Sequence, residues 1–238
     1  MMKYLKIFLF FIGITFFVSC SNEVGLFGEV DGNDNDSIEI KTINENVDSI
    51  IPISLPKRLL DASVTVMVYD KERNFIQFGS GVFVKSNIIA TNFHVIEGGW
   101  FFRVKRDSEK KSIDAEIYKF DDLHDVALLK IDTEFPNSVL SLNRKFPELG
   151  TDIMVAGSPE GLTGTLSKGI VSAIRKHPPY DYDLIQISAP ISHGSSGGPV
   201  VNMAGEIIGI SVSNFDGDKA QNLNFAVPAK YVQFLLAE

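Results

Sequence analysis

The segment PISHGSSGGPVV, residues 190–201, places Ser196 among glycines. Glycine adopts positive-φ conformations that other residues avoid, so such a turn can aim successive backbone N–H groups at one point. N–H groups of Gly194 and Ser196 that converge beside the serine hydroxyl would form an oxyanion hole, and the hydroxyl would be the nucleophile. A plain tight turn without chemistry is the alternative interpretation of these residues.

A histidine is needed to make this serine reactive, because a hydroxyl is a weak nucleophile unless a base accepts its proton. Of the four histidines, His94 lies just after an expected strand, where a side chain is held rigidly yet can open onto a cleft. His177 and His124 lie in polar segments, and His193 is too close to Ser196 in the sequence to be presented independently. His94 is therefore the candidate base, and a structural histidine is the alternative.

The base in turn needs an acid that fixes its tautomer and stabilises its charged form. In FDDLHDVALLKID, Asp125 directly precedes the apolar run 126–131. A carboxylate at the edge of a buried strand needs a partner to offset its desolvation. Asp121 and Asp122 lie in the turn and are expected to face solvent. Asp125 is the candidate acid, and a turn residue that starts a strand is the alternative.

The elements that must position these residues are short apolar runs separated by turns, from residue 59 onward. Val, Ile and Phe dominate the runs, as strands prefer. Strands are expected over residues 63–70, 75–84, 87–92, 100–107, 113–120, 126–131, 152–158, 169–174, 183–189, 199–202, 206–213 and 223–228. Such strands favour an all-β antiparallel barrel or sandwich, and about a dozen fit two barrels better than one. Helical spacing is confined to residues 229–238.

Composition and charge limit the classes of function. The chain has 238 residues, of which 45% are apolar, which suits one large domain or two small lobes. Its 22 Lys and Arg against 30 Asp and Glu give a formal net charge of −8. No basic run is longer than two residues, so we exclude nucleic acid as a partner.

The N-terminal segment is typical of secretion. Lys3 and Lys6 precede an apolar stretch that is too short to span a bilayer, so residues 1–19 are expected to be a signal peptide. The end of this stretch, FVSC, resembles the lipobox of bacterial lipoproteins, in which the cysteine, here Cys20, is acylated. Cys20 is the only cysteine, so it has no disulfide partner within the chain. An ordinary signal peptide is the alternative.

Residues 20–55 are rich in Asn, Asp, Glu, Ser and Gly. They lack the apolar density that would offset the entropy cost of ordering them. We expect the lipidated cysteine to be followed by a flexible tether over this range and by one domain over residues 56–238. A folded N-terminal strand is the alternative.

Three motifs in the order His, Asp, Ser carry a resemblance to a known family. TNFHVI, HDVALLK and HGSSGGPVVN together resemble the trypsin-like serine proteases of the HtrA/Deg type, and GSGVFV, EIIGISVS and NFAVPAKYV extend the likeness over residues 59–238. The resemblance implies two six-stranded barrels with a cleft between them. It implies His94 as the general base, Asp125 as the group that orients it, and Ser196 as the attacking nucleophile. It implies an oxyanion hole from the amides of Gly194 and Ser196, and no metal or cofactor.

The resemblance also indicates a specificity pocket. In this fold the residue six before the nucleophile floors the pocket, which here is Pro190. Further pocket residues would be Ile191, Ser211, Val212 and Ser213. No acid is present to attract Lys or Arg, so cleavage after small or medium apolar residues is expected. The alternative is that loops reshape the pocket.

Partners and location follow from the same likeness. Substrates would be unfolded or flexible polypeptides, and the protein would be lipid-anchored in a bacterial envelope, in the periplasm or at the outer membrane. Homotrimers in this family are built from N-terminal aromatics. Phe27 is the only aromatic residue between Ser21 and Lys57, so the chain offers little of that contact for a homotrimer. The sequence ends at Glu238, so no C-terminal PDZ module is expected. A non-proteolytic holdase or binding lipoprotein on the same fold is the rival hypothesis.

Overall fold

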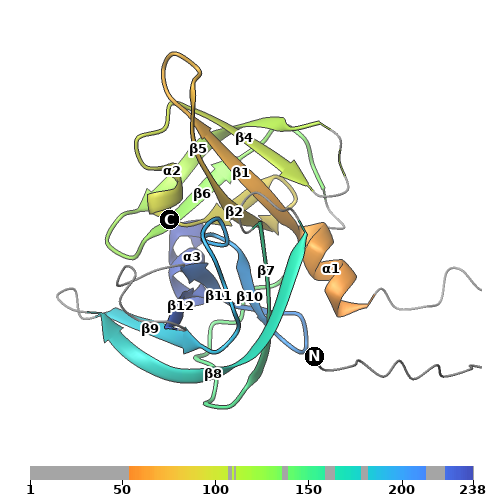
Figure 1. Ribbon diagram of the computed structural model, residues 1–238, viewed down its shortest axis with the longest axis vertical. Coiled ribbons are helices and arrows are strands. Elements are labelled where there is room, and N and C mark those ends of the chain that lie inside the picture. Colours follow the sequence, from red (N-terminus) through yellow and green to blue (C-terminus); the bar gives the residue numbers. More distant parts are fainter. Residues whose placement is uncertain are drawn as a thin grey trace, which may run out of the picture. The chain divides into compact units, whose positions relative to one another are not determined.

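Two closed antiparallel barrels of six strands each make up most of the described chain (Figure 1). The computed structural model describes residues 54–237 apart from 107–108, 110, 136–138, 159–163, 178–181 and 213–222. The two-barrel architecture predicted from the sequence is confirmed. Each of the twelve expected strands is present, although the expected strand 169–174 is part of a longer one.

The first barrel has the strand order β1-β2-β3-β6-β5-β4. Its strands are β1 (Ser63–Tyr69), β2 (Phe75–Lys85), β3 (Ile88–Thr91), β4 (Phe101–Arg106), β5 (Ile113–Asp121) and β6 (Val126–Lys130). Alternate residues of β1, namely Val64, Val66 and Val68, point into its core beside Phe83 and Leu129. Burial of alternate side chains is what the period of a strand predicts.

The second barrel has the strand order β10-β11-β12-β9-β8-β7. Its strands are β7 (Asp152–Gly157), β8 (Thr165–His177), β9 (Tyr182–Ile187), β10 (Pro199–Asn202), β11 (Ile207–Val212) and β12 (Asn224–Pro228). Its core contains Ile153, Val155, Ile185, Ile187 and Val200.

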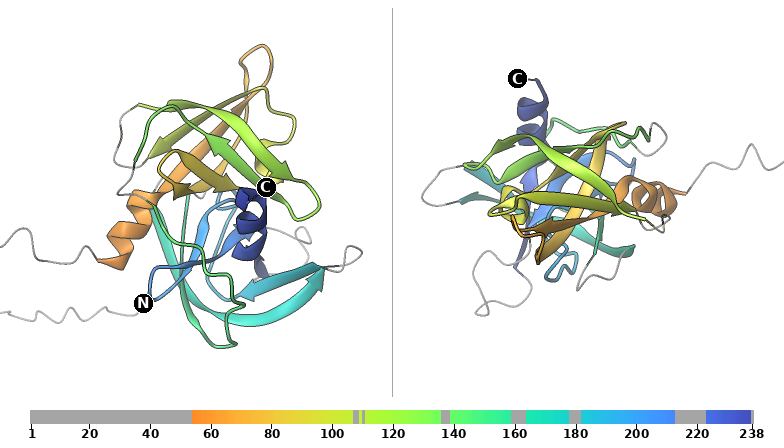
Figure 2. Two further views of the ribbon diagram at one scale, coloured as in Figure 1. Left: turned by 180° about the vertical axis from the view of Figure 1, so that it is seen from behind. Right: turned by 90° about the horizontal axis from the view of Figure 1, so that it is seen from above.

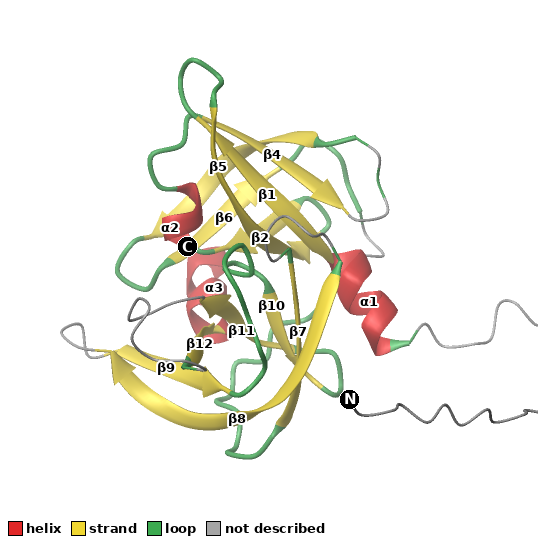
Figure 3. Ribbon diagram, viewed as in Figure 1, coloured by secondary structure: helices red, strands yellow, loops and turns green. Residues whose placement is uncertain are grey.

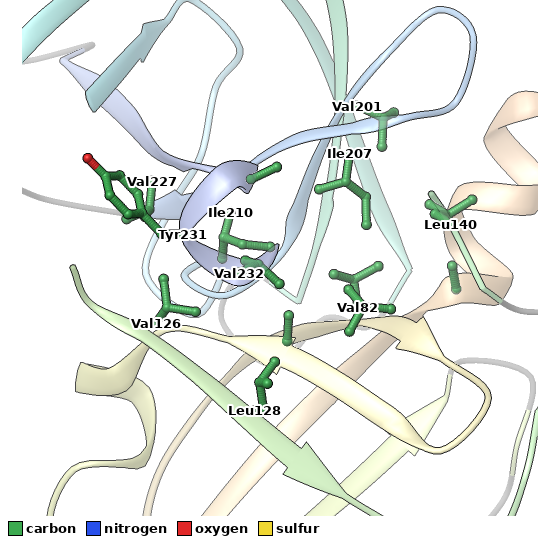
Figure 4. Close-up of a cluster of buried hydrophobic side chains, with 14 of the residues drawn as sticks. Val82, Val126, Leu128, Leu140, Val201, Ile207, Ile210, Val227, Tyr231 and Val232 are labelled. Carbon is green, nitrogen blue, oxygen red and sulfur yellow. The ribbon is translucent and has the colours of Figure 1, made fainter. Parts of the chain in front are cut away.

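A third apolar cluster joins the two barrels. Figure 4 shows Val82 and Leu128 of the first barrel on one side and Ile210 and Val232 on the other, all of them buried. Val232 belongs to the C-terminal helix α3 (Ala229–Ala237), which contacts β5 and β6 of the first barrel as well as β11 and β12 of the second (Figure 2). This packing fixes the first barrel relative to the second.

Two short helices were not expected from the sequence. α1 (Leu55–Ala62) begins with Pro56 in its first turn and buries Leu59, a position where proline's fixed φ favours a helix start. α2 (Phe93–Ile96) is a single turn between β3 and β4 (Figure 3). No helix in the described ranges is long and apolar enough to cross a membrane.

Candidate active site

His94 lies in the one-turn helix α2 rather than at a strand end, two residues beyond the fully buried Asn92. Its Nδ1 is 2.8 Å from Oδ2 of Asp125, and its backbone N–H donates to Oδ1 of the same carboxylate at 2.9 Å. A carboxylate only accepts hydrogen bonds, so Nδ1 carries the proton and Nε2 is left as the acceptor of the neutral ring. The side chain is 42% exposed, so the ring is open to a ligand on one side.

Asp125 is one of two described non-glycine residues with positive φ, here +53°. This left-handed conformation is uncommon outside glycine, and Asp is among the residues that tolerate it. The Asn92 side-chain amide donates to the Asp125 carbonyl at 2.9 Å. His94 and Asn92 together therefore hold both the carboxylate and the strained backbone of Asp125.

His124 anchors the turn that carries Asp125. Its Nδ1 lies 2.6 Å from Oδ2 of Asp121, and its ring stacks on Tyr231 of α3 with centroids 4.0 Å apart. The expectation that Asp121 faces solvent is wrong, because its carboxylate is partly buried against His124. The sequence reading missed His124 as a structural residue, since its ring partner lies in the C-terminal helix.

The loop that carries Ser196 depends on glycine at two positions. Gly194 and Gly197 have φ values of +89° and +91°. A Cβ on Gly197 would also lie 2.0 Å from the carbonyl oxygen of Ser80, so even a methyl group does not fit. The loop is closed by a hydrogen bond from the Gly198 N–H to the Ser195 carbonyl at 3.1 Å.

Ser80 of β2 ties this loop to the first barrel. Its N–H donates to the Ser196 carbonyl at 2.7 Å, and its hydroxyl donates to the Gly194 carbonyl at 2.8 Å. The same hydroxyl accepts from the Ser158 N–H at 2.9 Å, while the Thr91 hydroxyl donates to the Ser80 carbonyl at 2.7 Å. These groups are buried, so each bond avoids the cost of an unsatisfied polar group.

Gly79 of β2 lies between the segment that carries His94 and the loop that carries Ser196. A Cβ on Gly79 would lie 2.6 Å from Cγ1 of Val95 and 3.1 Å from the Ser196 carbonyl oxygen. Val95, the residue after His94, and the backbone of Ser196 therefore both lie close to the same glycine. The predicted acid, Asp125, contacts the predicted base, His94, directly. The backbone of the predicted nucleophile, Ser196, approaches the residue next to that base across Gly79.

The predicted pocket residues differ from one another in how far they are buried. Pro190 is exposed, Ile191 is partly buried against the core of the second barrel, and Val212 is buried in β11. Ser211 is also buried, and its hydroxyl donates to the carbonyls of Ser195 and Gly198 at 2.7 and 3.1 Å. The side chain of Ser211 thus braces the nucleophile loop, a role that the sequence reading missed.

Several predictions fall outside the described residues. They are those for Ser213, for Cys20, for the signal peptide and for most of the tether.

Comparisons with known proteins indicate the family of the chain. A family model described as a trypsin-like peptidase domain matches residues 79–210. The anti-sigma-I factor RsgI9 of Acetivibrio thermocellus is 32% identical over 198 residues, which cover 79% of this chain and 27% of that protein. A probable periplasmic serine endoprotease, DegP-like, of Pseudomonas savastanoi pv. phaseolicola is 37% identical over 164 residues, which cover 67% of this chain and 34% of that protein.

Solved structures show the same fold. The serine endoprotease from Yersinia pestis matches with a TM-score of 0.66 and 29% identity, covering 79% of this chain and 66% of that chain. The chain spans roughly a quarter to a third of the length of the two curated relatives.

Proposed function

Because the chain belongs to the trypsin-like peptidase family, we propose that it is a serine endopeptidase that hydrolyses peptide bonds through an acyl-enzyme. The observation that carries the proposal is the Asp125–His94 pair, joined by two hydrogen bonds of 2.8 and 2.9 Å beside the Ser196 loop. A carboxylate that fixes the histidine tautomer is the arrangement that serine activation requires.

In the proposed reaction, Nε2 of His94 takes the proton of the Ser196 hydroxyl as Oγ of Ser196 attacks the substrate carbonyl. Asp125 stabilises the imidazolium that forms. The backbone N–H groups of Gly194 and Ser196 donate to the developing oxyanion. His94 then gives its proton to the leaving amine, and water hydrolyses the acyl-enzyme by the same sequence of proton transfers.

The proposed substrates are unfolded or damaged polypeptides of a bacterial envelope. The DegP-like relative is by its printed name a periplasmic endoprotease, which supports this location. We further propose the boundaries expected from the sequence: a signal peptide over residues 1–19, a lipidated Cys20 with a tether to residue 55, and the peptidase domain over residues 56–238. The described helix α1 begins at Leu55, next to that boundary.

Finer features stay predictions. They include cleavage after small or medium apolar residues, in a pocket floored by Pro190, and assembly into a homotrimer.

The test compares degradation of unfolded casein by the purified protein and by its Ser196→Ala variant. We expect degradation by the wild type alone, because the variant lacks the nucleophile. Equal degradation by both proteins would contradict the proposal. Binding of casein without degradation by either protein would support the rival hypothesis, a holdase on the same fold.

A further inference from the structure

Four aromatic rings form a row that leads away from the nucleophile loop. Phe78 lies 6.3 Å from His193 and 6.3 Å from Phe75, and Phe75 lies 5.9 Å from Tyr69, measured between ring centroids. Tyr69 ends β1 and the two phenylalanines lie in β2, so the row follows one hairpin of the first barrel. We call Tyr69, Phe75, Phe78 and His193 the aromatic track.

The inner end of the track touches the proposed oxyanion hole. A Cβ on Gly194 would lie 2.4 Å from Cε2 of Phe78, so the ring packs directly on that glycine. The nucleophile loop also accepts a hydrogen bond from Ser211 of β11, the strand that contributes to the predicted specificity pocket. The track thus meets the loop at Gly194, whereas Ser211 meets it at Ser195 and Gly198. The predicted pocket would hold the residue before the scissile bond, which leaves the track for the residues that follow it.

The outer end of the track opens into a groove of about 650 Å³ on the first barrel. Tyr69 lines this groove together with Trp100, whose backbone N–H donates to the Tyr69 carbonyl at 2.8 Å. Trp100 is 69% exposed and Phe75 is 54% exposed. Large aromatic side chains left in solvent beside a groove mark a binding surface, because they offer much apolar area with few rotatable bonds.

We propose that the aromatic track and the Trp100 groove bind the segment of an unfolded polypeptide that follows the scissile bond, through its apolar and aromatic side chains. This inference rests on the proposed peptidase function. Three steps of about 6 Å separate His193 from Tyr69, and an extended chain advances about 3.3 Å per residue, so roughly six residues span the track. A folded protein does not offer such a segment, whereas an unfolded one does.

The charges in the groove favour a polypeptide over a membrane surface. Arg103 is paired with Asp114 at 2.9 Å, and the Arg73 guanidinium covers the Phe101 ring at 4.1 Å. Glu116 adds a further carboxylate to the lining. Paired and acidic groups gain little from anionic lipid headgroups, which attract clusters of unpaired basic residues.

The test uses the chain's only tryptophan, Trp100, as the probe. The full-length Ser196→Ala protein is titrated with a tryptophan-free, eight-residue peptide rich in Phe and Leu, and with a Gly/Ser peptide of equal length. We expect the apolar peptide alone to shift the Trp100 emission to the blue and to protect it from iodide quenching. Phe75→Ala in the same background should weaken binding on the order of tenfold, as loss of one well-packed aromatic contact does.

Leu149→Ala is the matched control, because Leu149 is 67% exposed in the loop before β7 and lies off the track. It should bind the peptide as tightly as its parent. Unchanged emission with the apolar peptide, or equal affinity for the Phe75→Ala protein, would overturn the inference. A shift with phosphatidylglycerol vesicles but not with peptide would overturn it in favour of a membrane surface.

The two proposals fail separately in these experiments. Peptide binding is measured without turnover in the Ser196→Ala protein. If that protein shows the emission shift while the wild type does not degrade casein, only the peptidase proposal is rejected. Casein degradation by a wild type whose Ser196→Ala variant binds no peptide would reject only the track.

Discussion

Asp125 combines a left-handed backbone with two hydrogen bonds to one histidine. Its φ is +53°, and its two carboxylate oxygens accept from the backbone and ring of His94. Strained conformations persist only where the surroundings over-determine them, and they gather at functional sites. At the residue scale, the strain at Asp125 therefore supports a carboxylate held for chemistry rather than a turn residue that starts a strand.

We expect Asp125→Asn to lower kcat by about 10⁴, because an amide can donate to Nδ1 of His94 and so favour the tautomer that cannot accept the serine proton. Asn also tolerates positive φ, so the fold should survive. The measurement is kcat on a peptide substrate beside a thermal unfolding curve. Asp122→Asn is the control, because Asp122 is exposed and should keep wild-type turnover. Wild-type kcat in Asp125→Asn would show that the carboxylate has no such role.

At the scale of elements, the turn between β5 and β6 is held by a helix from the far end of the chain. His124 in this turn bridges Asp121 at the end of β5 and Tyr231 in α3. Because Asp125 directly follows His124, the stack positions the acid as well as the turn. The helix α3 thus helps to position Asp125, although it contributes no reacting group to the site.

We expect His124→Ala to lower kcat by roughly 10- to 100-fold with little change in KM, since small misplacements of a catalytic group carry costs of this order. His124→Phe, which keeps a ring on Tyr231, should restore part of the loss. Steady-state kinetics on a peptide substrate measure both. An unaltered kcat in His124→Ala, with the protein folded, would mean that the stack does not position Asp125.

Local sequence patterns predict strands more reliably than they predict single turns of helix. Runs of Val, Ile and Phe between turns suffice for the twelve strands, because each run is long enough to show its character. Residues 93–96 form one turn of helix, too short to show a helical period, so His94 was expected at a strand end. The contact of His124 with Tyr231 joins residues far apart in the sequence, and no local pattern reports it.

At the scale of the whole molecule, the first barrel carries the proposed base and acid and also holds the nucleophile's loop. Ser80 of β2 donates to the carbonyls of both Ser196 and Gly194. The apolar cluster around Val82 and Ile210 fixes the barrels against each other. The order of the three motifs predicts which residues meet, but not these bridges, because they depend on how two separately formed cores pack.

The central claim is that Ser196 is the one activated nucleophile and that His94 activates it. Labelling of the full-length protein with a fluorophosphonate, followed by peptide mass spectrometry, tests this claim most directly, because the reagent bonds to a serine oxygen as fluoride leaves. We predict a single adduct on Ser196 that is lost in His94→Ala. An adduct on another residue, no adduct, or equal labelling of the His94→Ala variant would contradict the account.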